Sequence, residues 1–232
     1  SGIEALSGIP GTAGASPIQN IGAYGSEAEN TIAFIEAYDT TTDKFVSIPK
    51  KQCGFEYRSS VFRKNPGMFI IWSVYFSLQR NSTSAIPKYK DAIQYFEQKN
   101  IESPSLNQIR KAILEIRARK LPDPSVIPNC GSFFKNSILR NEVARKLKLK
   151  YPEMPTFSVS GNKSKIPAGW LIEKAGLRGC AENNIGVYEH NALVLINRGG
   201  GSFKDLDNLR NKIKEKVFNV FEIELEEEVN II

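Results

Sequence analysis

Residues 8–25 of this chain read GIPGTAGASPIQNIGAYG, a segment built from small or conformationally restricted residues. Five of its positions are glycine, and Pro10 and Pro17 each have a fixed φ. The segment therefore predicts a rigid loop rather than a helix or a strand. Its side chains offer little chemistry, but its backbone N–H groups can hold a phosphate or a planar anionic ring. The alternative interpretation is an ordinary connecting loop.

The composition is that of a globular protein. The chain has 232 residues, of which 41% are hydrophobic and 24% charged, enough for one large domain or two small ones. Its 31 basic and 25 acidic residues give a net charge of +6, which favours anionic ligands. The charge alone leaves a general polyanion binder open. Nucleic-acid binding is not expected, because no zinc-finger or helix-turn-helix spacing is present and no basic run alternates with aromatic residues.

The cysteines indicate neither a disulfide framework nor a metal site. Cys53, Cys130 and Cys180 are odd in number, far apart and outside any CxxC pattern. No apolar window is long enough to cross a bilayer, and no signal-peptide pattern opens the chain. We therefore expect a cytoplasmic protein without a metal or a membrane partner.

The region from residue 31 to residue 78 has the patterns of β-strands. Residues 31–38 and 44–48 alternate apolar and polar side chains on either side of a polar turn, which predicts a β-hairpin. Residues 68–78 are rich in β-branched and aromatic side chains, which favours a long central strand. The first third of the chain is therefore expected to form a sheet.

Helical patterns follow the strands. A short helix is expected over residues 87–96, and Ser105 has the character of an N-cap for a longer helix that ends near Lys120. Residues 121–128 then contain three prolines, which oppose helix continuation and predict a domain boundary. We expect a first domain over residues 1–121.

A second domain is expected over residues 122–222, and a returning strand over residues 223–232. The patterns of the second domain are an amphipathic segment (138–150), a short apolar helix (166–177), a buried strand (192–197) and a last helix that carries Leu206, Leu209, Ile213 and Val217. The apolar alternation of Phe221, Ile223 and Leu225 predicts the strand. The three acids that follow, 226–228, would by themselves be a solvated edge.

Two residues have both an ordinary and a chemical interpretation. Ser132 is a turn or cap serine, or else a hydroxyl beside two aromatic residues that passes a proton. It is not expected to be a triad nucleophile, because His190 is the only histidine and the Gly-x-Ser-x-Gly elbow is absent. Arg58 is a surface cation, or else an anion clamp, since a guanidinium binds a carboxylate through two hydrogen bonds.

Seven segments in order carry a family resemblance. They are IPGTAGASPIQNIGAYG (9–25), YRSSVFRK (57–64), KLPDP (120–124), GSFFKNS (131–137), IPAGWLIEKAGLRG (166–179), ALVLIN (192–197) and LEEEV (225–229). Together they resemble the UDP-N-acetylenolpyruvoylglucosamine reductase family, also called UDP-N-acetylmuramate dehydrogenase, of bacterial peptidoglycan synthesis. Residues 87–104 resemble the tyrosine-bearing insertion of the longer form of this enzyme.

The resemblance implies a fold and an activity. The implied fold is α+β, with the second subdomain of a PCMH-type FAD-binding fold followed by an α+β substrate-binding domain. The implied enzyme is a monomer that uses FAD to transfer hydride from NADPH to UDP-N-acetylglucosamine enolpyruvate, which yields UDP-N-acetylmuramate. A first FAD subdomain would precede Ser1, so this chain is expected to hold FAD weakly. The alternative is a flavin-free fragment that binds the UDP-sugar without catalysis.

The resemblance also implies catalytic roles. Arg58 resembles the arginine that holds the substrate carboxylate, where negative charge builds during reduction. Glu228 resembles an acid that assists at the same carboxylate, and Ser132 resembles the proton donor to the substrate carbon. A serine is a weak acid, so a nearby cation is expected, and Lys135 is the candidate.

Two binding sets complete the expectation. The substrate-binding residues are Tyr57, Tyr89, Lys120, Asn136 and Asn191. The cofactor-binding residues, all within the glycine-rich segment, are Pro10, Gly11, Gly14, Ser16, Gln19, Asn20 and Gly22. Asn191 stands where the family commonly has glutamine, and Tyr188 replaces a frequent histidine, so nucleotide contacts are expected to differ there.

Overall fold

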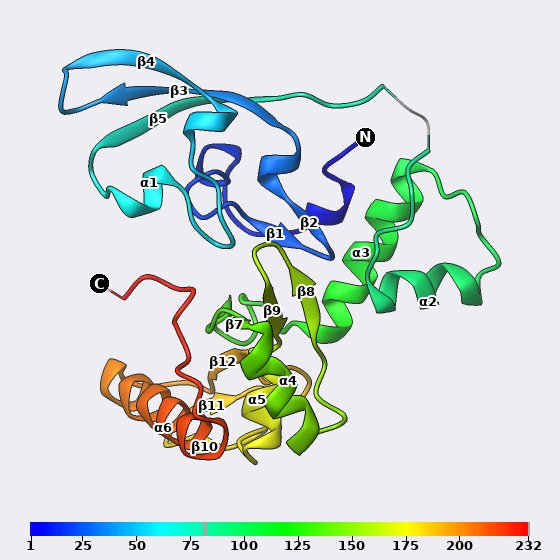
Figure 1. Ribbon diagram of the computed structural model, residues 1–232, viewed down its shortest axis with the longest axis vertical. Coiled ribbons are helices and arrows are strands. Elements are labelled where there is room, and N and C mark those ends of the chain that lie inside the picture. Colours follow the sequence, from blue (N-terminus) through cyan, green and yellow to red (C-terminus); the bar gives the residue numbers. More distant parts are fainter. Residues whose placement is uncertain (81–82, 232) are drawn as a thin grey trace. The chain divides into compact units, whose positions relative to one another are not determined.

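The structure is a computed structural model that describes residues 1–80 and 83–231. Contacts divide the chain into two compact units, Ser1–Arg117 and Ala118–Ile232, and each is described by itself. Both contain helices and strands, which confirms the α+β prediction (Figure 1). Within the described residues, no helix is both long enough and apolar enough to span a membrane.

The first unit contains an antiparallel sheet in the order β4-β3-β5. Its strands are β3 (Ile32–Asp39), β4 (Lys44–Pro49) and β5 (Phe69–Phe76), and the pairing of β3 with β4 confirms the predicted hairpin. The strand predicted over residues 68–78 is confirmed as β5, but its predicted central position is wrong, because β3 is central and β5 lies at the edge of this described sheet. The apolar run was misleading because Ile70 and Trp72 point to solvent, with exposures of 59% and 73%.

One face of this sheet is buried against the short elements of the unit. Ser60 caps α1 (Val61–Lys64) by accepting hydrogen bonds from Phe62 N–H and Arg63 N–H. The remaining short elements are η1 (Glu4–Leu6), η2 (Ala13–Ala15), β1 (Gly22–Ala23), β2 (Ser26–Glu27), η3 (Ala28–Asn30) and η4 (Lys50–Gln52). The buried cluster consists of Ala28, Ile32, Ile35, Ala37, Ile48, Cys53 and Phe62.

Two helices complete the first unit (Figure 1). Helix α2 (Lys90–Gln98) begins later than predicted, and α3 (Leu106–Lys120) begins and ends as predicted. Ser105 Oγ accepts from Gln108 N–H at 3.3 Å, and Gln108 Oε1 accepts from Ser105 N–H at 2.8 Å, which is a capping box. The small core between the helices contains Phe96, Ile109, Ala112 and Ile113.

The second unit contains two antiparallel sheets, one in the order β10-β11-β12-β6 and one in the order β7-β9-β8. The first comprises β6 (Asn129–Ser132), β10 (Ala181–Glu182), β11 (Ile185–Val187) and β12 (Val194–Asn197). The second comprises β7 (Ser137–Arg140), β8 (Phe157–Val159) and β9 (Lys163–Ile166). Strand β12 confirms the predicted buried strand, which the continuous apolar run of residues 192–196 indicated. The other strands of this unit are two to four residues long and lie in no such run, so they lacked a sequence signal.

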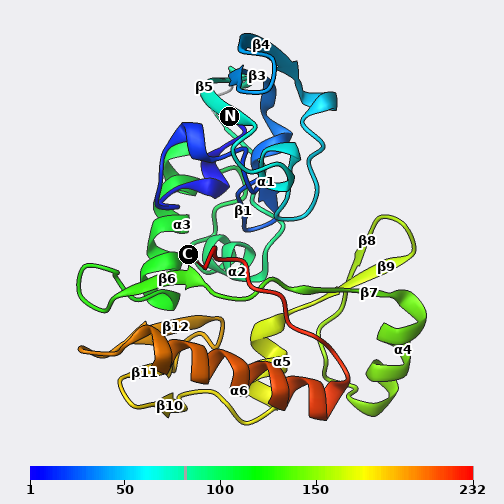
Figure 2. The same cartoon turned by 90° about the vertical axis from the view of Figure 1, so that its left-hand side faces the viewer.

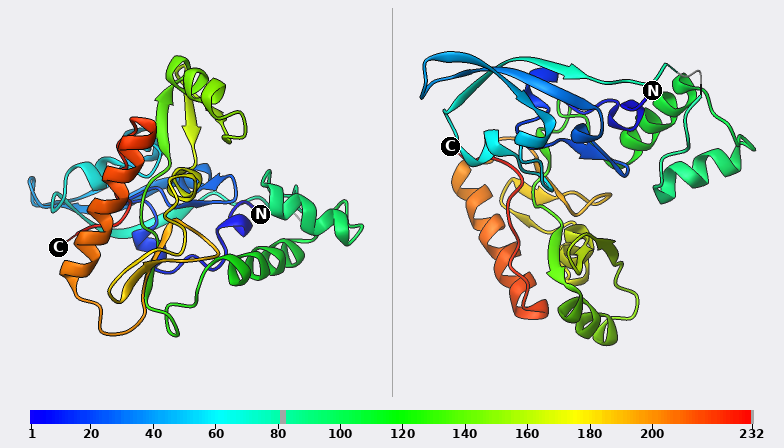
Figure 3. Two further views of the ribbon diagram at one scale, coloured as in Figure 1. Left: turned by 90° about the horizontal axis from the view of Figure 1, so that it is seen from below. Right: turned by 45° about the horizontal axis from the view of Figure 1, so that its top comes forward.

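Three helices pack around these sheets. They are α4 (Asn141–Lys150), α5 (Ala168–Lys174) and α6 (Phe203–Phe221), and Figure 2 shows α6 beside β10 and β11. Figure 3 shows α4 next to the β7-β9-β8 sheet. The single amphipathic segment predicted over residues 138–150 is wrong in part, because its first residues pair with β9 as β7. Helix α6 is confirmed, with Leu209, Ile213 and Val217 buried.

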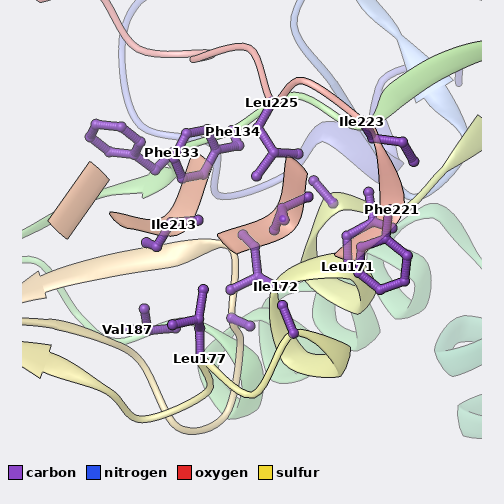
Figure 4. Packing of buried hydrophobic residues seen from close by; sticks show 14 of the residues in the cluster. Phe133, Phe134, Leu171, Ile172, Leu177, Val187, Ile213, Phe221, Ile223 and Leu225 are labelled. Atoms are coloured by element: carbon purple, nitrogen blue, oxygen red, sulfur yellow. The ribbon is translucent and has the colours of Figure 1, made fainter. Parts of the chain in front are cut away.

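The end of the chain is extended but forms no continuous strand in the described residues. Ile223 and Leu225 are 3% and 2% exposed, so the predicted alternation is present (Figure 4). In residues 223–231 the pairing consists of one isolated bridge between Phe134 and Glu227, so the predicted returning strand is present there as an extended segment that pairs at a single position. Both apolar side chains belong to the hydrophobic core of this unit, Leu225 beside Phe134 and Ile223 nearer to Phe221 (Figure 4).

Candidate functional site

The glycine-rich loop has short 3₁₀ turns stabilised by its own hydroxyl groups. Thr12 Oγ1 accepts from Ala15 N–H at 3.3 Å, and Ser16 Oγ donates to Ala13 O at 2.7 Å. Ser16 is 4% exposed, so its hydroxyl serves the loop itself. The segment is therefore mostly a loop of short turns, as predicted, and near its end it contains the two-residue strand β1 (Gly22–Ala23).

One side of this loop leaves the backbone accessible. Pro10 and Gly11 are exposed, and Gly11 has a φ of +112°. A Cβ added at Gly11 would meet no atom within 4 Å, and one at Gly14 would meet only Thr12 Oγ1, at 3.9 Å. A ligand can therefore approach the main chain from this side, as the cradle interpretation requires.

Asn20 is the centre of a buried hydrogen-bond network beneath the loop. It is fully buried with a φ of +47°, a left-handed conformation that asparagine tolerates better than most residues. Its Oδ1 accepts from Glu29 N–H at 2.9 Å. Its Nδ2 lies 3.3–3.4 Å from Glu27 Oε2, Glu29 Oε1 and Glu56 O. Asn20 thus joins the loop to the nearby segment of Glu27 and Glu29 and to the distant Glu56.

Arg58 lies in a tight turn beside the same network. Glu56 and Ser59 close the turn with two backbone hydrogen bonds of 3.0 and 3.1 Å, and Tyr57 and Arg58 occupy its two central positions. Arg58 has a φ of +53°, and its guanidinium carbon lies 5.1 Å from the centre of the Tyr57 ring. This turn therefore places the guanidinium at the glycine-rich loop.

The Arg58 guanidinium is oriented by a carbonyl and a carboxylate. Its Nη2 donates to Gly22 O at 2.6 Å, and its Nη1 lies 3.8 Å from Glu27 Oε1. The Arg58 side chain is 14% exposed, so these interactions are less screened than a surface pair would be. Glu27 joins Arg58 to Asn20 and was missed from the sequence, where an acid in a short polar segment carries no signal.

Neighbouring residues of the YRSSVFRK segment also hold the loop. Arg63 Nη1 donates to Gln19 Oε1 at 3.1 Å, and Ser60 Oγ donates to Ile18 O at 2.6 Å. Neither Arg63 nor Ser60 was predicted as a site residue, although Ser60 directly before a helical segment is an N-cap signal. The structure thus brings Gln19, Gly22 and Arg58 together within the first unit.

Gly22 has no room for a side chain, which gives a first testable prediction. A Cβ at this position would lie 2.7 Å from Arg58 Nη1 and 2.8 Å from Glu27 Cγ. We expect Gly22→Ala to displace the guanidinium and to lower the free energy of unfolding by about 1–3 kcal/mol, measured by urea denaturation. Gly14→Ala is the matched control, expected to stay within about 0.5 kcal/mol of the parent. Equal stability of Gly22→Ala and the parent would contradict the contact with Arg58.

Tyr24, near the end of the loop, contacts the predicted substrate residue Tyr89. Their rings meet edge to face with centroids 5.0 Å apart. Burial raises the pKa of the Tyr24 hydroxyl to about 12, against the opposing attraction of Arg117. Tyr24 is therefore a neutral hydrogen-bonding group at physiological pH. Tyr89 itself is 39% exposed at the start of α2.

Ser132 and Glu228 lie on adjacent segments of the second unit. Ser132 ends β6, where it pairs with Val194 of β12, and Gly131 precedes it with a φ of +74°. The next residue, Phe133, accepts a hydrogen bond from Glu228 N–H at 2.8 Å. The structure thus brings two of the three predicted catalytic residues into one unit, whereas Arg58 belongs to the other.

The three consecutive acids of the C-terminal segment have different surroundings. Glu226 forms an ion pair with Lys135, the cation expected to assist Ser132, and their side chains are 72% and 13% exposed. Glu227 is paired with Lys214 at 2.9 Å and with Arg210 at 3.7 Å. Burial raises the pKa of Glu227, but the hydrogen bond and charge of Lys214 outweigh it, so the pKa is lowered overall.

The remaining predicted substrate residues have structural contacts in the second unit. Asn136 Oδ1 accepts from Ala168 N–H at 3.0 Å, at the first residue of α5. Asn191 Oδ1 accepts from Leu193 N–H at 3.1 Å, within the turn before β12. Lys120 is half-buried at the end of α3. These hydrogen bonds explain how Asn136 and Asn191 are held, and the nucleotide roles of all three residues stay predictions.

A further hollow in the second unit was not predicted from the sequence. It has a volume of about 560 Å³. Its lining residues are Val126, Ile127, Pro128, Tyr188, Glu189, Ile196, Asn197, Arg198 and Gly199. No group of three or more histidine, cysteine or acidic side chains able to hold a metal ion occurs in residues 1–80 and 83–231.

Comparisons with known proteins agree with the motifs. Residues 123–232 match the family described as UDP-N-acetylenolpyruvoylglucosamine reductase, C-terminal domain. A protein of that enzyme name from Polynucleobacter asymbioticus is 46% identical over 231 residues, which are 100% of this chain and 66% of the relative. One from Flavobacterium johnsoniae is 38% identical over 232 residues, covering 100% of this chain and 69% of the relative.

A solved structure agrees with the fold. The reductase of this name from Thermus caldophilus superimposes with a TM-score of 0.63 at 23% identity, over 99% of this chain and 64% of that chain. The chain thus spans about two thirds of the length of the proteins it matches. On the strength of its curated relatives, the chain belongs to the UDP-N-acetylenolpyruvoylglucosamine reductase family.

Proposed function

We propose that this chain carries the substrate-reducing part of an FAD-dependent enzyme that uses NADPH to reduce UDP-N-acetylglucosamine enolpyruvate to UDP-N-acetylmuramate in peptidoglycan synthesis. One observation carries the proposal: relatives with this enzyme name align with the whole chain at 38–46% identity. The flavin, when bound, supplies the hydride. A cytoplasmic location and a monomeric state stay predictions.

The glycine-rich loop fits a flavin cofactor. The open backbone at Gly11 and Gly14 accommodates close approach of a pyrophosphate or a flavin ring. The side chains of Ser16 and Asn20 are turned into the unit, so they shape the loop rather than contact a ligand directly. Within the predicted cofactor set, we therefore assign ligand contact to backbone groups and loop support to side chains.

The proposed task of Arg58 is to bind the substrate carboxylate. Its charge is permanent, and its position is set by Gly22 O and Glu27 before any substrate arrives. Such preorganised charge stabilises the negative charge that develops on the carboxylate during reduction. Tyr57 supports this role by packing against the guanidinium.

The proposed task of the second unit is proton delivery. Reduction of the enolpyruvyl double bond adds a hydride to one carbon and a proton to the other, and the Ser132 hydroxyl is the proposed proton donor. Glu228 is proposed to assist at the carboxylate. Lys135 is engaged by Glu226, so its help to Ser132 would be an electrostatic effect at a distance.

A direct test uses the protein that contains this chain. We expect the purified protein to be yellow, and to oxidise NADPH only when UDP-N-acetylglucosamine enolpyruvate is added, followed by absorbance. A colourless protein that leaves NADPH unchanged would contradict the proposal. Calorimetry with the sugar nucleotide then distinguishes the alternative, because heat of binding without flavin absorbance indicates a flavin-free UDP-sugar-binding protein.

A further inference from the structure

The middle acid of the C-terminal segment has the most specific partners of the three. In an extended segment neighbouring side chains point to opposite sides, and Glu227 lies on the same side as the buried Leu225. Its side chain is 18% exposed, against 72% for Glu226. A partly buried carboxylate needs a cation, and α6 supplies two.

The two cations of α6 form a clamp around Glu227. Arg210 and Lys214 are four residues apart and therefore lie on one face of the helix. Lys214 Nζ is 2.9 Å from Glu227 Oε1, and Arg210 Nε is 3.7 Å from the same oxygen. Arg210 is itself held by Asp207 at 2.6 Å. The clamp thus fixes the carboxylate from a rigid element.

The clamp is coupled through the backbone to the segment of Ser132. On one side of Glu227, Lys135 N–H donates to Glu226 O at 2.8 Å, and on the other side Glu228 N–H donates to Phe133 O at 2.8 Å. These two hydrogen bonds flank Glu227 and form its isolated bridge to Phe134, the only β-bridge of this segment in the described residues. Glu227, the residue that α6 holds, is therefore at the centre of the contact that places Glu228 next to the end of β6.

We propose that Lys214, with Arg210, is a positioning residue that holds Glu228 in register with Ser132 by clamping Glu227 to α6. The inference rests on the proposed function, because the position of Glu228 affects the rate only if Glu228 acts in the reaction. No contact between Lys214 and a substrate is assigned. Its physical basis is that one isolated bridge orders an extended segment weakly, and that a small misplacement of a reacting group has a large effect on rate.

The test compares Lys214→Met with Lys212→Met in the flavin-loaded protein. Lys212 is on the same helix and pairs with Glu182 at 3.1 Å, with side chains 52% and 35% exposed, so its removal is the matched control. We expect Lys214→Met to lower kcat by about 10–100-fold with little change in KM, and Lys212→Met to leave kcat within about two-fold. Lys214→Arg should restore most of the activity, because it keeps the charge.

A second readout does not depend on activity. Amide hydrogen exchange, measured by NMR, should be at least ten-fold faster at Glu228 N–H in Lys214→Met, and unchanged in Lys212→Met. Glu227→Gln should reproduce both effects, and the double variant should be no worse than either single one. Unchanged exchange at Glu228, or equal effects of the two lysine variants, would overturn the inference.

The outcomes separate this inference from the proposed function. If Glu228→Gln leaves product formation unchanged while Lys214→Met accelerates exchange, the clamp exists but the proposed role of Glu228 is wrong. If Glu228→Gln is inactive while Lys214→Met retains both full kcat and slow exchange, the role of Glu228 stands and the clamp is refuted. Circular dichroism of each variant checks that α6 is still folded.

Discussion

Ser132→Ala is expected to slow product formation by about 10²–10⁴-fold, the range of a lost general acid step, while flavin reduction by NADPH continues at nearly the parent rate. The reason is that the hydroxyl acts only when the substrate carbon is protonated. Rapid mixing separates the two half-reactions, because flavin absorbance falls on reduction and recovers when the substrate is reduced.

The environment of Ser132 allows alanine to remove the hydroxyl group without a change in the local structure. Ser132 is half-buried at the end of β6, and its strand position depends on backbone pairing with β12 rather than on the hydroxyl. Alanine should therefore preserve the local structure. Ser158→Ala, on the exposed strand β8, is the control and should leave both half-reactions unchanged. An equal loss in flavin reduction would show that Ser132 has another role.

Asn20→Ala is expected to lower the free energy of unfolding by about 2–5 kcal/mol, from a left-handed backbone conformation and from buried polar groups that lose their partner. The first contribution follows from the φ of +47°. The second follows from the 2.9 Å hydrogen bond to Glu29 N–H and from the loss of the Nδ2 contacts. The sum of the two contributions is the difference in the free energy of unfolding between the variant and the parent, measured by urea denaturation.

Asn20→Gly divides this effect into its two parts. Glycine adopts a positive φ without strain but makes no side-chain hydrogen bonds. We expect Asn20→Gly to be more stable than Asn20→Ala by about 1–2 kcal/mol, yet still less stable than the parent. If the two variants were equally stable, the backbone conformation at Asn20 would contribute nothing. If Asn20→Ala matched the parent, the network would have no role in stability.

Both predictions concern residues, Ser132 and Asn20, whose role the residue type alone did not decide. The loop segment was predicted to hold a ligand, yet in the structure Asn20 and Ser16 stabilise the loop itself, while the accessible backbone lies at Gly11 and Gly14. The family resemblance therefore predicted a ligand-binding role for the whole segment but did not distinguish residues open to a ligand from residues that support the loop. That distinction depends on which way each side chain points.

Regular elements with a sustained local pattern were predictable from the sequence. The hairpin of β3 and β4 and the long helices α3 and α6 carry their own periodicity, and both of these helices begin after a capping serine. The buried strand β12 was indicated by a continuous apolar run instead. Strands of two to four residues, such as β10 and β11, are too short to show an alternation, and their existence depends on neighbours along the sheet.

By itself the sequence determined the family and the order of the main elements, because periodicity, capping and motifs are local properties of the chain. Only the tertiary structure decided that Asn20 meets Glu27, Glu29 and Glu56, that Arg58 is turned onto Gly22 O, and that Lys214 reaches Glu227. These contacts join residues that lie 7 to 36 positions apart, beyond the reach of a single helical or strand repeat. Their selection depends on burial and on the pairing of charges, which no local pattern encodes.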